Sequence, residues 1–356
     1  MPTKSKEGQA TIMDIARATG FSIATVSNVL NHKGANYGKD TEELINKAIE
    51  ELNYIPHAIA RQLKNQSSRN IAFIVPNIDD YYSGLYSGIQ SLANEIGYSL
   101  LLFNTNYDTS QVERFIMDIR EQRFAGLIIA TYFPDTQRIM KIKRGIPIVS
   151  IGKLDAHIPY VALNDKEVVK EAVNHLISLG HKRIGLFIGP MSVITEKDRF
   201  SGYLEAHQDN GLKVDAELIF QGNFVVLNSL SESYRIISEA IRKTPDISAF
   251  LFTSDYISAV ALRAVADAGK RVPQDISIIG FDNLPITEYL IPRLTTISQD
   301  RFKVGYNGMK MLDELINGKS VENRIIEADL LIRDSTGRPE NCGVDPRTVI
   351  EDEKTE

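Results

Sequence analysis

Short amphipathic helices account for the apolar positions in the first part of the chain. Up to about residue 65, apolar side chains recur at the spacing of one helical face, without a strand-like run. Thr11 and Asp14 have the spacing of a cap at the start of a first helix. Gly20 allows a tight turn before a second helix, predicted over 23–30. A third helix is predicted over 41–52, with these residues facing inward: Leu44, Ile45, Ala48, Ile49 and Leu52.

A different pattern begins at Asn70, where short apolar runs alternate with amphipathic helical stretches. The predicted strands are Ile71–Val75, Ser99–Phe103, Gly126–Ala130, Pro147–Ile151, Ile184–Ile188, Ala249–Thr253 and Ile276–Phe281. The predicted helices are Ser83–Ile96, Ser110–Gln122, Lys166–Leu179, Lys197–Asp209, Ser231–Arg242 and Asp255–Ala268. Strands that are apolar on both faces and separated by helices are typical of parallel sheets covered on both sides. Seven such strands are more than we expect in a single sheet, so the prediction is an α/β core of two doubly wound parallel-sheet subdomains. A ligand cleft is expected at the carboxyl ends of their strands.

A short polar segment joins the two patterns. Residues 58–64 have helical spacing after Pro56, but an isolated helix of two turns is marginal in water. After Arg338 no periodic apolar face remains, and disorder is expected. The predicted divisions are an all-α helix-turn-helix domain (9–55), a hinge helix and linker (56–69), a core (70–338) and a disordered tail (339–356). Within the core, the N-subdomain is predicted over 70–163 and 294–322, and the C-subdomain over 164–293 and 323–338.

Composition is that of a globular protein: 43% of the 356 residues are hydrophobic and 24% are charged. No apolar run is long enough to cross a bilayer, and the first residues lack the apolar stretch of a signal peptide, so we expect a cytoplasmic protein with no membrane partner. The single cysteine, Cys342, excludes a disulfide or a cysteine-based zinc cluster within the chain. The net charge is −6, yet residues 1–69 hold nine Lys and Arg against seven Asp and Glu, which suits a module that meets phosphates.

The second predicted helix has the residue types of a helix that contacts DNA bases. Val26, Val29 and Leu30 occupy one side, and the other side or its edges hold Ala24, Thr25, Ser27 and Asn28. Small and polar side chains allow close approach to base edges in a major groove. The same spacing is also compatible with a small helical bundle that binds no nucleic acid.

Two rival classes can be compared with this interpretation. The sequence does not support an interpretation as an enzyme, because it contains no glycine-rich phosphate loop and no G-x-S-x-G nucleophile turn. The six histidines show no metal-ligand spacing, and neither a metal nor a cofactor is expected. A solute- or sugar-binding protein without a DNA role is the alternative for the core, although it would not carry the helical segment that precedes it.

Several motifs in order make the chain resemble the lactose/galactose repressor family. In the N-terminal part they are Thr11–Ala16, Gly20–Ser22, Thr25–Asn31, Leu52–Pro56 and Ala60–Leu63. In the core they are Gly180–Ile184, Val272–Asp282 and Leu294–Ile297, and the similarity continues to about Arg338. The resemblance implies a homodimeric transcription repressor on a pseudo-palindromic operator. Its core would resemble periplasmic sugar-binding proteins and bind a small-molecule effector, preferably a carbohydrate, that controls operator affinity allosterically.

The resemblance also implies the DNA contacts. They are Thr11, Ser22, Ile23, Ala24, Thr25, Ser27, Asn28, Asn31, Tyr54, Ala60, Leu63 and Lys64. Leu63, on a linker helix that orders only on DNA, would push into a minor-groove step and kink the duplex, unless it is an ordinary packing residue. The family usually has arginine, or less often histidine, at Asn28. Because asparagine pairs with adenine and arginine with guanine, we hypothesise an A·T pair where relatives contact G·C.

The effector contacts implied by the resemblance are Tyr81, Tyr82, Arg199, Phe224, Ser254, Asp255 and Asp282. Aromatic rings stack on the apolar face of a sugar, while a carboxylate and a guanidinium bracket its hydroxyl groups. Alternatives stay open: Asp282 as a helix cap, Arg199 in a structural ion pair, and a purine-type effector on the aromatic rings. The sequence does not separate induction from corepression, because either needs only differential affinity for the DNA-competent state.

Overall fold

The chain forms two units, residues 1–68 and residues 69–356. The computed structural model describes residues 10–30, 37–54, 69–133, 135–222 and 229–340. The predicted hinge helix and residues 341–356 of the predicted tail lie outside these ranges. As the two sequence patterns predict, the first unit contains helices only within its described residues, and the second alternates strands with helices.

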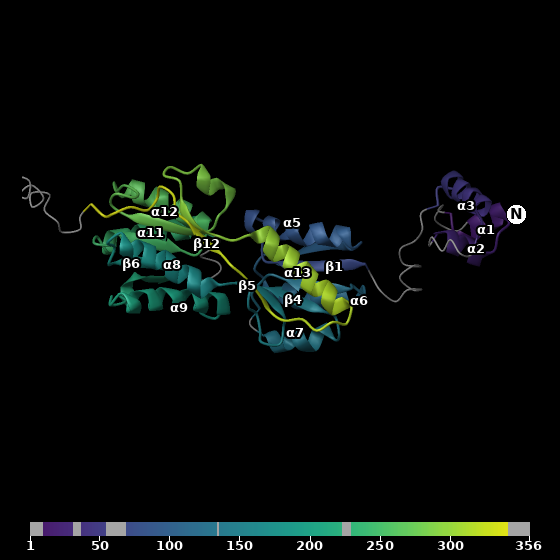
Figure 1. Ribbon diagram of the computed structural model, residues 1–356, viewed down its shortest axis with the longest axis horizontal. Helices are drawn as coiled ribbons and strands as arrows, with labels where there is room; N and C mark the ends of the chain where they lie inside the picture. The colour runs from purple at the N-terminus through teal and green to yellow at the C-terminus, as the bar shows by residue number, and fades with distance from the viewer. Residues whose placement is uncertain (1–9, 31–36, 55–68, 134, 223–228, 341–356) are drawn as a thin grey trace, which may run out of the picture. The chain divides into compact units, whose positions relative to one another are not determined.

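Three helices pack around a small apolar core in the first unit (Figure 1). They are α1 (Ile12–Thr19), α2 (Ile23–Leu30) and α3 (Lys39–Glu51). Gly20 ends α1 with a left-handed backbone conformation (φ 73°), which a glycine adopts without a steric penalty. The buried side chains of this core are Ile15, Val26, Val29, Ile45 and Ala48.

Two residues of α3 were predicted to face inward and do not. Leu44 is 55% exposed and Leu52, which follows the helix, is 39% exposed. Ile45 and Ala48, one turn apart, fill the space that two eight-residue helices leave open. Leu44 lies beside this narrow stripe, and Leu52 lies past the end of the helix.

The second unit contains two six-stranded sheets. The first has the order β11-β5-β4-β3-β1-β2, and the second has the order β12-β10-β9-β8-β6-β7. The first is built from β1 (Asn70–Val75), β2 (Ser99–Asn104), β3 (Gly126–Ile129), β4 (Ile148–Ile151), β5 (Tyr160–Leu163) and β11 (Arg324–Ile326). The second is built from β6 (Ile184–Ile188), β7 (Ile219–Gln221), β8 (Ala249–Phe252), β9 (Ser277–Asp282), β10 (Thr295–Ser298) and β12 (Asp329–Leu331). We call the parts built on them the N-lobe and the C-lobe.

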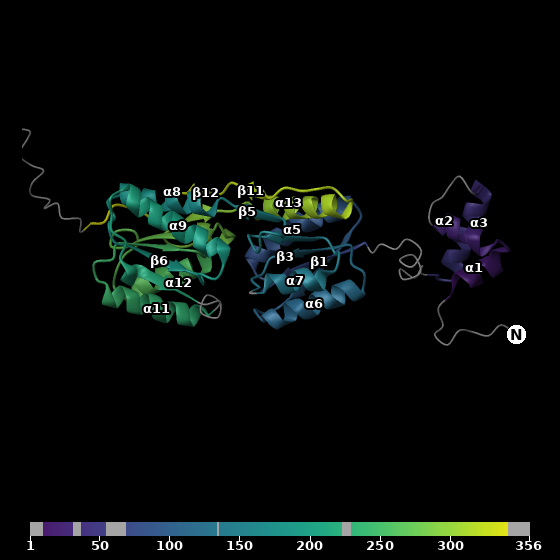
Figure 2. The same cartoon turned by 90° about the horizontal axis from the view of Figure 1, so that it is seen from below.

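Helices cover both faces of each sheet (Figure 2). In the N-lobe, α5 (Asp80–Glu95) and α13 (Arg301–Ile316) lie on one face, and α6 (Thr109–Glu121) and α7 (Thr136–Lys143) lie on the other. In the C-lobe, α8 (Asp165–Ser178) and α9 (Ile194–Asp209) lie opposite α11 (Leu230–Lys243) and α12 (Asp255–Asp267). The described residues also form two short 3-10 helices, η2 (Ala216–Leu218) and η3 (Pro285–Glu288).

Strand β1 shows why its sequence is apolar throughout. Ile71, Phe73 and Val75 join the apolar cluster that includes α5 and α13, whereas Ala72 and Ile74 join the cluster beneath α6 and α7. Strands are parallel throughout both sheets except for the antiparallel pairing of β10 with β12. The fold prediction of two doubly wound subdomains is therefore confirmed.

The predicted subdomain boundaries need two corrections. Strand β10, at the start of the segment 294–322 that was predicted for the N-subdomain, pairs with β9 of the C-lobe. Strand β11, in the segment 323–338 that was predicted for the C-subdomain, pairs with β5 of the N-lobe. Hydrogen-bond partners decide to which sheet a short strand belongs, and the hydrophobic pattern contains no information about them. The chain therefore passes between the lobes after β5, after β10 and after β11.

Candidate functional site

Side-chain caps fix the start of both helices in the helix-turn-helix. Thr11 and Asp14 form a reciprocal cap, because the Asp14 carboxylate accepts the Thr11 N–H at 2.9 Å and Thr11 Oγ1 accepts the Asp14 N–H at 3.4 Å. The hydrogen bonds from Thr11 lower the pKa of Asp14. At the start of α2, Ser22 Oγ accepts the Thr25 N–H at 3.1 Å. Both caps satisfy backbone donors that a helix start otherwise leaves without a partner.

The predicted DNA contacts on α2 divide by exposure. Ile23 is 48% exposed and Ala24 is also exposed, while Ser27 and Asn28 are half-buried at the edge of the same face. Tyr54 packs against the apolar core of the first unit. Four further predicted DNA contacts lie outside the described residues: Asn31, Ala60, Leu63 and Lys64.

A cavity of about 440 Å³ opens at the carboxyl ends of the strands, with walls from both lobes. This is where ligands bind in open α/β folds, and the volume fits a small molecule. Five predicted effector residues line it: Tyr81, Tyr82, Arg199, Ser254 and Asp282. Phe224 lies outside the described residues, and Asp255 does not line the cavity.

The start of α5 places two tyrosines in the cavity wall. Asp79 caps the helix, accepting the backbone N–H groups of Tyr81 and Tyr82 at 3.0 and 3.1 Å. The two rings meet edge to face with centroids 4.9 Å apart. Burial raises the pKa of both tyrosines, so their hydroxyl groups stay protonated and able to donate hydrogen bonds.

Arg199, on α9, is held by groups on three sides. Its Nε donates to Asp165 at 2.8 Å and its Nη1 donates to Glu196 at 3.1 Å. Its guanidinium carbon lies 3.9 Å from the centre of the Phe281 ring. Burial opposes the charge, but Asp165 and Glu196 outweigh it and raise the pKa of Arg199 above its ordinary value. The predicted ligand residue is therefore also the centre of an ion-pair cluster, which was the alternative left open.

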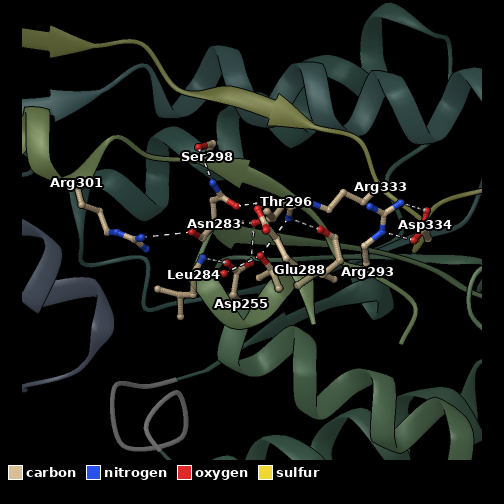
Figure 3. A network of polar contacts seen from close by, with 12 residues as sticks. Asp255, Asn283, Leu284, Glu288, Arg293, Thr296, Ser298, Arg301, Arg333 and Asp334 are labelled. Atoms are coloured by element: carbon tan, nitrogen blue, oxygen red, sulfur yellow. Dashed lines mark hydrogen bonds and ion pairs between the residues drawn. The ribbon is translucent and has the colours of Figure 1, made fainter. Parts of the chain in front are cut away.

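Asp282 points into the cavity from a strained turn at the end of β9. Asp282 and Asn283 have φ values of 115° and 50°, conformations that side chains other than glycine adopt at a cost. Neighbouring donors hold them in place. Arg301 donates to the Asp282 carbonyl at 3.0 Å. Arg333 donates to the Asn283 side chain at 2.8 Å (Figure 3). Gln299 Nε2 donates to Asp282 Oδ1 at 2.6 Å. Burial and the nearby Asp255 raise the pKa of Asp282.

Asp255 was predicted to contact the effector, and the structure corrects this. Its side chain is fully buried behind the cavity wall, where Thr296 Oγ1 donates to it at 2.6 Å and the Leu284 N–H at 2.8 Å (Figure 3). Burial raises the pKa of Asp255 to about 7. Asp255 therefore fixes the turn that presents Asp282 and does not itself line the cavity.

Two side-chain contacts cross the cavity from one lobe to the other. Lys153, after β4 in the N-lobe, forms an ion pair of 2.5 Å with Asp198 on α9. On α12, the Tyr256 hydroxyl donates to Asp80, at the start of α5, at 3.3 Å. These contacts hold the lobes at the separation seen here.

Sequence reasoning missed several residues of the cavity wall. They include Tyr107, Tyr132, Lys153, Asp165, Glu196, Tyr256 and Gln299. Tyr132 and Lys153 follow β3 and β4 within a few residues, so the rule that ligands meet the carboxyl ends of strands would have found them. Asp165 and Gln299 also follow strands, β5 and β10, but the hydrophobic pattern did not predict those strands. Glu196 lies on α9, eight residues after β6, and carries no such signal.

Two other kinds of site were sought within the described ranges. No group of three or more His, Cys, Asp or Glu side chains there is placed to hold a metal ion. Across the same residues, no helix is both long and apolar enough to span a membrane.

Comparisons with known proteins match the N-terminal helices and the core to two separate family models. Residues 11–57 match the family model of bacterial regulatory proteins of the lacI family. Residues 68–334 match the model of periplasmic binding proteins and the sugar binding domain of the LacI family.

Similarity extends along nearly the whole chain. The HTH-type transcriptional repressor PurR of Pasteurella multocida (strain Pm70) is 32% identical over 333 residues, covering 92% of this chain and 98% of the relative. The repressor CytR of Escherichia coli (strain K12) is 31% identical over 346 residues, covering 94% and 99%. A crystal structure of the lac repressor dimer bound to operator and the anti-inducer ONPF is 26% identical, with a TM-score of 0.82, covering 92% of this chain and 99% of that one. The chain belongs to the lacI family of bacterial regulatory proteins.

Proposed function

We propose that this protein is a transcription repressor whose affinity for operator DNA is set by a small molecule bound in the cleft of its core. One observation carries the proposal: a single chain combines a capped helix-turn-helix with a cavity of about 440 Å³ lined by aromatic and charged side chains. A solute-binding protein would have no use for the first of these, and the repressor interpretation accounts for both.

The DNA contacts are expected on the exposed side of α2. Ile23 and Ala24 are free to approach base edges, while Val26 and Val29 anchor the helix from behind. Asn28 lies at the edge of this face, where its amide suits adenine, so we keep the hypothesis of an A·T pair at that position. Leu63 remains the proposed minor-groove wedge on the strength of the sequence motif alone.

We propose a sugar or sugar derivative as the effector. The cavity combines aromatic rings such as Tyr81 and Tyr82 with a carboxyl group, Asp282, that faces the same space. Aromatic rings pack on the apolar faces of sugars, and carboxyl groups bind their hydroxyls. A purine-type effector would use the same rings, and the experiment below includes both classes.

A homodimer is the proposed assembly. Ile286, Tyr289 and Ile291 lie within six residues of each other, and the last two are 77% and 95% exposed. Large apolar side chains exposed together mark an interaction surface. The related lac repressor was crystallised as a dimer on its operator, which supports the same arrangement for this chain on a pseudo-palindromic site. Since operators are in the cytoplasm of a bacterium, we propose that the protein acts there, and as a regulator rather than an enzyme.

A mobility-shift assay with the DNA upstream of the protein's own gene tests the proposal. The full chain should shift this DNA, and Leu63→Ala should weaken the shift strongly while leaving effector affinity nearly unchanged. Candidate sugars and nucleosides are then added at increasing concentration, and one of them should change the fraction of DNA bound. The proposal is wrong if purified protein shifts no DNA from this region, or if no ligand of the cleft changes the shift.

A further inference from the structure

Carboxylates outnumber cationic groups among the charged side chains that line the cavity. The acidic residues are Asp79, Asp165, Glu196 and Asp282, and the basic ones within the described residues are Lys153 and Arg199. The core segments that the structure does not describe, residue 134 and residues 223–228, contain no lysine, arginine or histidine. The charged groups named above therefore set the sign of the cavity's charge.

Both cationic groups already have carboxylate partners. Arg199 donates to Asp165 and to Glu196, and its flat face lies on the Phe281 ring. Lys153 is paired with Asp198 at 2.5 Å. A bidentate arginine or a free lysine is what proteins use to bind a phosphate group, and here both are committed before a ligand arrives.

A third cation near the cavity is committed as well. Arg301 donates one Nη to the carbonyl oxygen of Asp282 at 3.0 Å and the other to that of Asn283 at 3.3 Å. These bonds hold the strained turn, so Arg301 cannot turn toward a ligand without releasing Asp282 from its position. Asp282 itself presents a carboxyl group to the cavity, which accepts hydrogen bonds from hydroxyl groups and, in its ionised form, repels an anion.

We propose that the cleft selects an uncharged effector, whose hydroxyl or N–H groups donate to Asp282, and excludes the phosphate ester of the same compound. The inference rests on the proposed function, since it specifies the chemistry of that effector. Glu196 and Asp198 become the residues that determine charge specificity, because each neutralises a cation that would otherwise attract a phosphate. A phosphate ester carries a charge of about −1.5 to −2 near neutral pH, and here it would meet excess carboxylates without a free counter-charge.

Inorganic phosphate tests the inference without knowledge of the effector. Its affinity for the full chain is measured by isothermal titration at constant ionic strength, for the wild type, Glu196→Gln and Asp198→Asn. Glu196→Gln frees Nη1 of Arg199, and its amide oxygen can still accept the Gly189 N–H that Glu196 accepts at 2.9 Å. Asp198→Asn frees Lys153 at a more exposed position, so it remains informative if the buried substitution disturbs folding. The helix-turn-helix is identical in all three proteins, so differences between them report the cleft.

Each variant is expected to bind phosphate at least tenfold more tightly than the wild type. Equal affinities in all three proteins would overturn the inference, as would wild-type phosphate binding that Lys153→Met or Arg199→Lys weakens. Matched pairs supply a second readout: ribose with ribose 5-phosphate, glucose with glucose 6-phosphate, and cytidine with its monophosphate. The inference is overturned if any phosphate ester binds more tightly than the unphosphorylated compound of its pair. The proposed function would still stand in that case if the phosphate ester alters operator binding. If none of the ligands that bind the cleft alters operator binding, the proposed function is contradicted instead.

Discussion

Replacing Asp255 by asparagine should stabilise the protein at alkaline pH. Asp255 is fully buried, and burial raises its pKa from 3.8 to about 7. At pH 8 the carboxylate is ionised in both the folded and the unfolded chain, so folding must bury its charge. A shift of about three pKa units corresponds to a cost of about 4 kcal/mol at most. Asparagine removes that charge, while its amide can still accept the Leu284 N–H and donate to the Thr296 hydroxyl.

The sign of the effect determines its pH dependence. Between pH 7 and pH 4 the folded state takes up a proton at Asp255 that the unfolded state does not, so the wild type gains stability from this group as the pH falls. The advantage of Asp255→Asn should therefore fall to less than half of its pH 8 value by pH 5 and vanish below about pH 4. The measurement is the free energy of unfolding in urea, followed by circular dichroism at pH 8, 6 and 5.

Asp255→Ala is the matched control. It removes the same charge but leaves the Leu284 N–H and the Thr296 hydroxyl without their acceptor, at a cost of about 1–3 kcal/mol for each buried group. We expect alanine to be clearly less stable than asparagine at every pH. The reasoning fails if Asp255→Asn is less stable than the wild type at pH 8, or if its advantage is the same at pH 5. Loss of effector binding in a folded Asp255→Asn protein would instead restore Asp255 as a ligand residue.

Three further substitutions test separate parts of the structure. Asn28→Arg should move the preferred operator base pair at one position from A·T to G·C, and selection from randomised operators that returns the same base for both proteins would contradict this. Lys153→Met removes the ion pair with Asp198 across the cleft, which is worth about 1 kcal/mol for a partly exposed pair. Titration should therefore show roughly fivefold weaker binding of an uncharged effector. Unchanged affinity would mean that the ion pair does not hold the lobes in the ligand-binding arrangement. Gly305→Ala places a methyl group 2.1 Å from a backbone oxygen of α5 and should destabilise the N-lobe by about 3 kcal/mol, measured by unfolding in urea. The control, Lys310→Ala on the exposed side of α13, should have the same urea midpoint as the wild type within error.

Hydrophobic pattern predicted the central strands because they are buried on both faces. It missed β10, in which Thr295 and Thr296 are buried polar residues that satisfy their hydroxyl groups within the C-lobe. It also missed short edge strands such as β7 and β12, which are only partly buried. A strand made of hydroxyl residues, or one covered on a single side, has no distinctive apolar run, so only its partners in the folded sheet reveal it.

Sequence reasoning placed residues in the cavity wall where position in the fold decides, and misplaced Asp255 where local backbone geometry decides. Asp282 and Asp255 are both acidic residues at the carboxyl end of an apolar strand, and the sequence treats them alike. The φ of 115° at Asp282 turns one carboxyl group into the cavity, while the Leu284 N–H draws the other behind the wall. Neither the strained turn nor the ion-pair partners of Arg199 can be inferred from spacing, since both arise from tertiary contacts.

The three connections between the lobes have a mechanical consequence. A single covalent link would allow one lobe to twist about the other, whereas three chain crossings, after β5, after β10 and after β11, join the lobes at several points and resist torsion. Opening and closing of the cavity is then favoured over twisting. A small molecule bound between the lobes therefore acts on their separation, and surfaces far from the crossings move further than the atoms that the ligand touches.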